Sequence, residues 1–74
     1  MKQIKLTAII EREDDGYVAL CPEIDVASQG DTVDEARANL QEAVEGFFEA
    51  ASASEVAQRL GVERYVEQME VSIG

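Results

Sequence analysis

Histidine is absent from this 74-residue chain, and cysteine occurs once, as Cys21. Without histidine, neither a Ser-His nor a Cys-His catalytic pair can form, and the commonest general base is missing. One cysteine excludes a disulfide within the chain and cannot build a structural zinc site alone. Because Cys21 lies in an apolar stretch beside the acidic Glu23, no neighbouring cation activates its thiol. We interpret it as a small buried hydrophobe.

Lysine and arginine are also scarce: the chain has 6 of them against 16 aspartates and glutamates, which gives a net charge of −10. Nucleic-acid binding depends on basic side chains that displace counterions from phosphates, so we expect no direct contact with DNA or RNA. The glycines are too scattered for a phosphate-binding loop, and we expect no cofactor. The acidity favours a basic protein partner, or it serves solubility alone.

The sequence shows neither a long apolar run nor the pattern of a secretory leader. Its opening residues, Met1–Lys5, mix charged, polar and apolar side chains and have no targeting character. No apolar stretch is long enough to span a bilayer. Together with the single thiol, this predicts a cytoplasmic protein without a membrane partner.

Acidic clusters are the one feature that suggests enzymatic chemistry. They are Asp14-Asp15, Glu23 with Asp25, and Asp31. Carboxylates bind Mg²⁺, but a hydrolytic two-metal site needs several that converge from different elements. Here two belong to an expected turn and one precedes an expected helix. We therefore predict solvated acids, no metal site, no catalytic residue and no enzymatic activity; a reduced nuclease is the enzymatic alternative.

Apolar residues make up 46 % of the chain and follow periodic patterns, which argues against disorder. Alternation over residues 3–13 predicts a strand with one buried face, and residues 17–21 and 24–29 predict two more. The run Asp14-Asp15-Gly16 is typical of a tight hairpin, because glycine adopts positive φ freely. A two-residue Asp15-Gly16 turn and a three-residue Asp14–Gly16 loop are both compatible with it, and they pair the strands differently.

Thr32 begins the predicted main helix. In its Thr-x-x-Glu capping box, the Thr32 hydroxyl accepts a hydrogen bond from the amide of Glu35, and the Glu35 carboxylate reaches back to the Thr32 amide. Gly46 is unfavourable in the interior of this helix, and close packing against the sheet would explain its presence. An apolar stripe at spacings of three and four faces the expected core: Val33, Ala36, Leu40, Ala43, Val44, Phe47 and Ala51.

A second, shorter helix is predicted over residues 55–60, with Ser54 as its cap and Gly61 at its end. Alternation over residues 64–73 predicts a last strand. The order is then β-β-β-α-(short α)-β, with the last strand returning parallel to the first through a right-handed crossover. The sequence thus predicts one domain over residues 1–74, an α+β two-layer sandwich with the main helix on one face of the sheet.

Two runs of this sequence resemble the HicB family of antitoxins: Ile9–Glu23 and Ser28–Ala36. The first holds an Asp-Gly-Tyr-apolar-Ala hairpin followed by Pro-Glu, and the second reads Ser-Gln-Gly-Asp-Thr before an amphipathic helix. The resemblance implies a partial RNase H-like fold without nuclease activity. It also implies a role in a type II toxin-antitoxin system, in which the antitoxin binds and neutralises HicA, a small basic toxin that cleaves mRNA.

The sequence departs from the family pattern in two places. Many relatives carry Pro-Gly-Cys after the second strand, where this chain has Ile24-Asp25-Val26-Ala27. Full-length HicB antitoxins also append a DNA-binding domain that represses their own operon, and we expect this chain to be a solo form without it. The alternative function is therefore an orphan, non-catalytic oligomeric domain that binds proteins.

Self-association is expected because a domain of this length has a thin core. A single helix layer covers one sheet face only, so one apolar set of the second strand must face away from it, and such a patch usually marks an interface. We predict a homodimer or homotetramer that uses the helix-free sheet face or an edge strand. The predicted partner or oligomer contacts are Ile9, Tyr17, Ala19, Cys21, Glu23 and Asp25.

Overall fold

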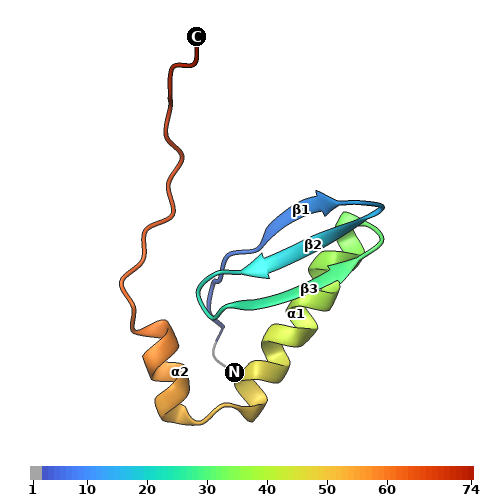
Figure 1. The fold of residues 1–74 in the computed structure, drawn as a ribbon. Helices are drawn as coiled ribbons and strands as arrows, with labels where there is room; N and C mark the ends of the chain where they lie inside the picture. The colour runs from blue at the N-terminus through green and yellow to red at the C-terminus, as the bar shows by residue number, and fades with distance from the viewer. Residues whose placement is uncertain (1–2) are drawn as a thin grey trace.

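The computed structural model describes residues 3–74 and arranges them as a three-stranded antiparallel sheet followed by two helices (Figure 1). Strands β1 (Ile9–Glu13), β2 (Gly16–Cys21) and β3 (Val26–Gly30) lie in the order β1-β2-β3. Helix α1 (Val33–Ala50) packs on one face of the sheet, and α2 (Ala53–Leu60) follows after a short turn. The predicted α+β class and the order of these elements are confirmed. Residues 1–2 of the predicted domain lie outside the described residues.

The β1–β2 hairpin turns at Asp14 and Asp15, which is neither of the two predicted loops. Glu13 is paired with Gly16, and Asp14 takes the left-handed conformation, with a φ of 53°. Aspartate tolerates this conformation because its short polar side chain hydrogen-bonds locally. Gly16 is needed for space instead: a Cβ on it would lie 2.9 Å from the carbonyl oxygen of Gly30.

This register decides which side chains face α1. Residues paired across antiparallel strands point to the same face of the sheet. Ala19 is buried beneath α1, so its partners Ile10 and Ser28 lie on the helix side as well. A shift of one residue would exchange the two faces, because side chains alternate along a strand. The equivalent row on the open side is Ile9, Leu20 and Ala27.

The buried core is small and lies between α1 and the sheet. Its members are Ala19, Cys21, Ile24, Ala36 and Leu40. Partly buried apolar residues surround them: Leu6, Ile10, Tyr17, Val26, Val44, Phe47 and Phe48. Ile24 and Leu40 are the two large aliphatic side chains of the buried set, so the core removes little apolar surface from water. Val44 and Phe47, predicted as core residues, pack against it from the edge.

Both helices begin at hydroxyl caps. The hydroxyl of Thr32 accepts a hydrogen bond from the amide of Glu35 at 3.1 Å, as predicted. The Glu35 carboxylate, however, accepts from the amide of Asp31, also at 3.1 Å, and not from that of Thr32. Helix α2 begins earlier than predicted, because Ser52 and not Ser54 is its cap. The Ser54 hydroxyl lies 3.2 Å from that of Ser52.

Gly46 lies on the exposed side of α1, where the position of a Cβ would have no neighbouring atom within 4 Å. The predicted packing of Gly46 against the sheet is therefore wrong. The close approach of helix and sheet occurs at Gly30, where a Cβ would lie 2.5 Å from the amide nitrogen of Ala36. Strand β3 and the first turns of α1 can meet this closely because Gly30 has no side chain.

The first strand is shorter than predicted because its partner ends early. β2 stops at Cys21, and Pro22 begins the turn to β3, so residues 3–7 have no position opposite them on that strand; Ala8, opposite Cys21, is not paired. Residues 3–8 have no regular secondary structure, and the chain bends where they join β1 (Figure 1).

The predicted last strand is not formed within this chain. Residues 62–74 are exposed throughout. They follow α2 as an extended segment that runs away from the sheet (Figure 1). The radius of gyration, 14.5 Å, exceeds the value of about 11 Å expected for a compact chain of this length. Alternation alone does not make a strand, because its backbone groups need a neighbouring edge. Between residues 3 and 74, no helix is long and apolar enough to cross a membrane.

Candidate functional site

An acidic hollow lies where the β1–β2 turn meets the start of α1. The turn and the helix start are neighbours because Tyr17 pairs with Gly30 in the sheet. Among the described residues that line the hollow, none is a lysine or an arginine. Negative charge on a concave surface focuses the electrostatic potential there. Five carboxylates line the hollow: Glu13, Asp14, Asp15, Asp31 and Glu35.

The acidic hollow offers negative potential and no coordination site. Within residues 3–74, no group of three or more aspartate, glutamate or cysteine side chains is placed to hold a metal ion. Glu35 is already engaged, because its carboxylate accepts the amide of Asp31. The remaining acidic side chains are exposed and solvated, so the hollow is suited to contact with cationic side chains.

Glu23, a predicted contact residue, holds two parts of the fold together. Its carboxylate accepts hydrogen bonds from the amide of Thr7 at 3.0 Å and from the Thr7 hydroxyl at 2.6 Å. The thiol of Cys21 donates to the same carboxylate at 3.5 Å. These bonds join the segment 3–8 to the turn between β2 and β3.

Both titratable groups of this cluster have shifted pKa values. Partial burial of Glu23 opposes ionisation, but the hydrogen bonds from Thr7, from its own backbone amide and from the Cys21 thiol together outweigh burial and lower the pKa of the carboxyl. Burial, followed by the hydrogen bond to Glu23, raises the pKa of the Cys21 thiol. A thiol with a raised pKa stays protonated and unreactive at neutral pH. The interpretation of Cys21 as a buried hydrophobe agrees with its exposed fraction of 1 %.

The sheet face opposite α1 carries an apolar patch, here called the open-face patch, formed by Ile9, Val18, Leu20 and Ala27. Ile9 is 41 % exposed and Ala27 is also exposed, whereas Val18 and Leu20 are half-buried. No described helix packs on this face (Figure 1). The prediction that one apolar set of the second strand faces away from the helix is therefore confirmed.

The predicted interface residues lie on different parts of the structure. Ile9 lies in the open-face patch, and Asp25 is exposed in the turn after β2, with a φ of 55°. Ala19 and Cys21 are buried beneath α1 and do not lie on the open face of the sheet. Tyr17 lies half-buried on the same, helix-covered side.

The hairpin register is the reason why the predicted residues lie on different faces of the sheet. Sequence reasoning grouped Ile9 with Tyr17, Ala19 and Cys21, whereas the two-residue Asp14-Asp15 turn groups it with Leu20. Sequence reasoning therefore did not identify Leu20, Val18 and Ala27 as residues of the open face. Alternation along β2 separated the two sets correctly, but only the register could assign each set to a face.

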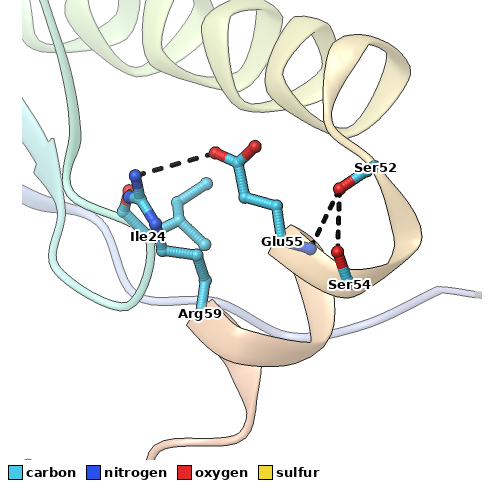
Figure 2. A network of polar contacts seen from close by, with 5 residues as sticks. All are labelled: Ile24, Ser52, Ser54, Glu55 and Arg59. Carbon is cyan, nitrogen blue, oxygen red and sulfur yellow. Dashed lines mark hydrogen bonds and ion pairs between the residues drawn. The ribbon is translucent and has the colours of Figure 1, made fainter.

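Arg59 connects α2 to the β2–β3 turn and to α1 (Figure 2). Its Nη1 donates a hydrogen bond to the backbone oxygen of Ile24, and its Nη2 lies 3.8 Å from Oε1 of Glu55. The guanidinium also lies 5.5 Å from the ring centroid of Phe47 on α1. No local pattern could have identified this role, because Arg59 and Ile24 lie 35 positions apart in the sequence.

Among known proteins, this chain is 58 % identical over 47 residues to the UPF0150 protein ssl0738 of Synechocystis sp.. The chain is similar to a UPF0150 protein over this stretch. The match covers 61 % of this chain and 65 % of the UPF0150 relative, whose name states no activity or ligand. No protein-family model matches the chain, and no solved structure is significantly similar to it.

Proposed function

We propose that this protein is a non-catalytic antitoxin of the HicB type that acts in the cytoplasm and neutralises a small basic, mRNA-cleaving toxin of the HicA type. The observation that carries the proposal is the acidic hollow, where carboxylates from the β1–β2 turn and the start of α1 lie on one concave surface. A toxin that binds RNA must offer lysine and arginine side chains to its phosphates. The hollow gives those side chains a competing anionic surface.

The sequence resemblance to HicB antitoxins also supports the acidic hollow as the surface that contacts the toxin. The two runs that carry the resemblance lie side by side, because Tyr17 pairs with Gly30 and Val18 with Gln29. Part of the shared pattern serves packing, as the close approach at Gly30 shows. The exposed acids in these runs have no such packing role, and they are the side chains that a basic partner would contact.

Neutralisation by this surface needs no chemical step. With a net charge of −10, the protein attracts a basic partner and speeds its association. Once bound, it covers the basic residues through which the toxin would hold mRNA. The attraction acts between exposed charges, so it weakens as salt shortens the screening length, which is about 8 Å at physiological ionic strength.

A second candidate is an orphan, non-catalytic domain that binds copies of itself or other proteins. The open-face patch favours it, because Ile9, Leu20 and Ala27 place apolar surface in water across all three strands. A gene for a small basic protein beside the gene of this chain would favour the antitoxin. Stable self-assembly without any such partner would favour the orphan domain.

The decisive experiment expresses a HicA-type toxin encoded beside this gene, with and without this protein, and follows growth and mRNA integrity. We expect the protein to restore both. Asp14→Lys/Asp15→Lys should associate with the toxin at least about tenfold more slowly. Glu42→Lys/Glu49→Lys makes the same change in net charge on the exposed side of α1 and should behave nearly as wild type. Failure of the folded wild-type protein to restore growth, or equal losses in both variants, would refute the proposal.

A further inference from the structure

Residues 65–73 have the properties of a strand without a partner. Apolar Tyr65, Met69, Val71 and Ile73 alternate with polar residues along them. Met69 is 86 % exposed and Ile73 is 92 % exposed. Within residues 3–74, the hydrogen bond recorded for this segment joins the hydroxyl of Tyr65 to the neighbouring carboxylate of Glu63. The segment, here called the arm, therefore leaves apolar side chains and backbone groups in water.

Strand β1 provides a free edge. It lies at the end of the sheet order, with β2 on one side and no described strand on the other. The edge continues into residues 3–8, which extend past the end of β2. This stretch includes Ile4, Leu6 and Ile10 and has no proline that would block pairing. An open edge of this kind is a template for another strand.

An apolar groove lies on the helix side of this edge. It has a volume of about 820 Å³ and is bounded by residues 3–8, by α1 from Arg37 to Phe48 and by α2. The groove exists because α1 packs mainly over β3 and β2 and leaves the β1 side of the sheet uncovered (Figure 1). Its lining includes Ile4, Leu6, Val44, Phe48, Val56 and Leu60.

We propose that the arm of a second copy of this chain pairs along the free β1 edge and covers the groove, and that two copies exchange their arms reciprocally. The arm is as long as the edge formed by residues 3–11, so all of it finds backbone partners. Its side chains alternate, so Met69, Val71 and Ile73 face one side together. Pairing places this set against the apolar lining of the groove.

The edge and the groove wall each hold one basic and one acidic residue: Lys5 and Glu11 on the edge, Arg37 and Glu45 in the wall. Lys5 is exposed on the edge and Arg37 lines the groove, and they belong to the 6 basic residues of an otherwise acidic chain. The arm carries Glu67 and Glu70. Glu67 shares the face of Met69, so it comes to a groove whose wall holds Arg37, the ion-pair partner of Asp34, and also the acidic Glu45.

The occupant is a second copy because the chain's own arm runs away from the groove. From the end of α2, residues 62–74 extend away from the sheet and do not return along it (Figure 1). Reciprocal exchange gives each copy a fourth strand and closes two open edges with one symmetric contact. This inference is independent of the proposed function, since the acidic hollow lies at the opposite end of β1.

The test uses the full chain in sedimentation experiments at micromolar concentration. We expect wild type to sediment at twice its chain mass of 8.1 kDa. Met69→Glu/Val71→Glu puts two charges on the groove-facing set and should sediment as a monomer. Gln68→Glu/Ser72→Glu adds the same charge to the opposite set and should keep the wild-type mass. All four positions are exposed, so the helical circular dichroism of both variants should match wild type.

A second measurement identifies the copy that supplies the arm. Deuterated protein whose methionine methyl groups alone carry protons and isotope label is unfolded, mixed with unlabelled protein and refolded, so that any Leu6 or Phe48 proton near a labelled methyl belongs to the other copy. We expect nuclear Overhauser effects between Met69 of one copy and Leu6 or Phe48 of the other. A monomeric wild type, contacts only within one copy, or an assembly that survives Met69→Glu/Val71→Glu would each overturn the exchange.

Discussion

The carboxylate of Glu23 is hydrogen-bonded to the backbone amide of Thr7 at 3.0 Å, although the two residues lie 16 positions apart. The bond forms just beyond the point where β2 ends at Cys21, so a side chain supplies the acceptor that a longer strand would have provided. It fixes the segment 3–8 beside the groove and thereby positions the free edge of the sheet.

The Glu23–Thr7 contact predicts a pH-dependent contribution to stability. A carboxyl with a lowered pKa in the folded state stabilises the fold above its unfolded pKa of about 4.3, and that contribution disappears as the pH falls through the folded value. We therefore expect wild type to unfold at a higher urea concentration than Glu23→Gln near neutral pH. The difference between their unfolding midpoints should disappear below about pH 4. Exposed Glu42→Gln is the control, and a Glu23→Gln gap that stays constant with pH would contradict the assignment.

Gly46→Ala is expected to stabilise the protein. Nothing within 4 Å would obstruct the new Cβ, and the backbone of α1 is helical at this position. Removing glycine from an exposed helix interior raises the free energy of unfolding by about 1 kcal/mol. Gly30→Ala should do the opposite, since its Cβ would lie 2.5 Å from the amide nitrogen of Ala36. Urea unfolding of both variants tests the pair, and a destabilising Gly46→Ala would show that the helix end is packed differently.

Arg59→Met should release α2 from the β2–β3 turn and from α1. The substitution removes the hydrogen bond to the backbone oxygen of buried Ile24 and the contact with the Phe47 ring. Loss of a hydrogen bond from a charged donor lowers the free energy of unfolding by about 1–2 kcal/mol. The amides of α2 should then exchange hydrogen faster, while those of α1 change little. Arg37→Met is the matched control, because its ion pair with Asp34 is exposed and contributes less than about 0.5 kcal/mol. Equal effects of the two variants would argue against the α2 contact.

Purified protein is expected to leave RNA and RNA–DNA hybrids intact in the presence of Mg²⁺ or Mn²⁺. The acidic side chains around the hollow come from a turn and a helix start and do not converge on a common point for two metal ions. Gel analysis over several hours checks this. Reproducible cleavage that disappears on changing Asp14, Asp15 or Asp31 to asparagine would replace the antitoxin proposal with a nuclease.

The local elements of the fold could be predicted from the sequence because their signals lie within one turn of chain. The Thr32 hydroxyl and the Glu35 amide meet through helix geometry alone, so the start of α1 was predictable to the residue. The contacts that place α2 were not predictable, because Arg59 reaches Ile24 across 35 positions. The candidate site divides in the same way: the acids of the turn and helix start were visible, but their meeting in one hollow depends on the pairing of Tyr17 with Gly30.

The sequence by itself determined the alternating strands, the order of the elements and the capped helix, since each follows from hydrogen bonds and apolar spacing among near neighbours. Only the tertiary structure decided the hairpin register, because Asp14 and Gly16 both tolerate positive φ and the choice is made by packing of Ala19 and Cys21 beneath α1. It also decided the state of residues 64–73. Their alternation is that of a strand, but a strand forms only where another edge accepts its backbone hydrogen bonds, and a single copy of this chain places none beside them.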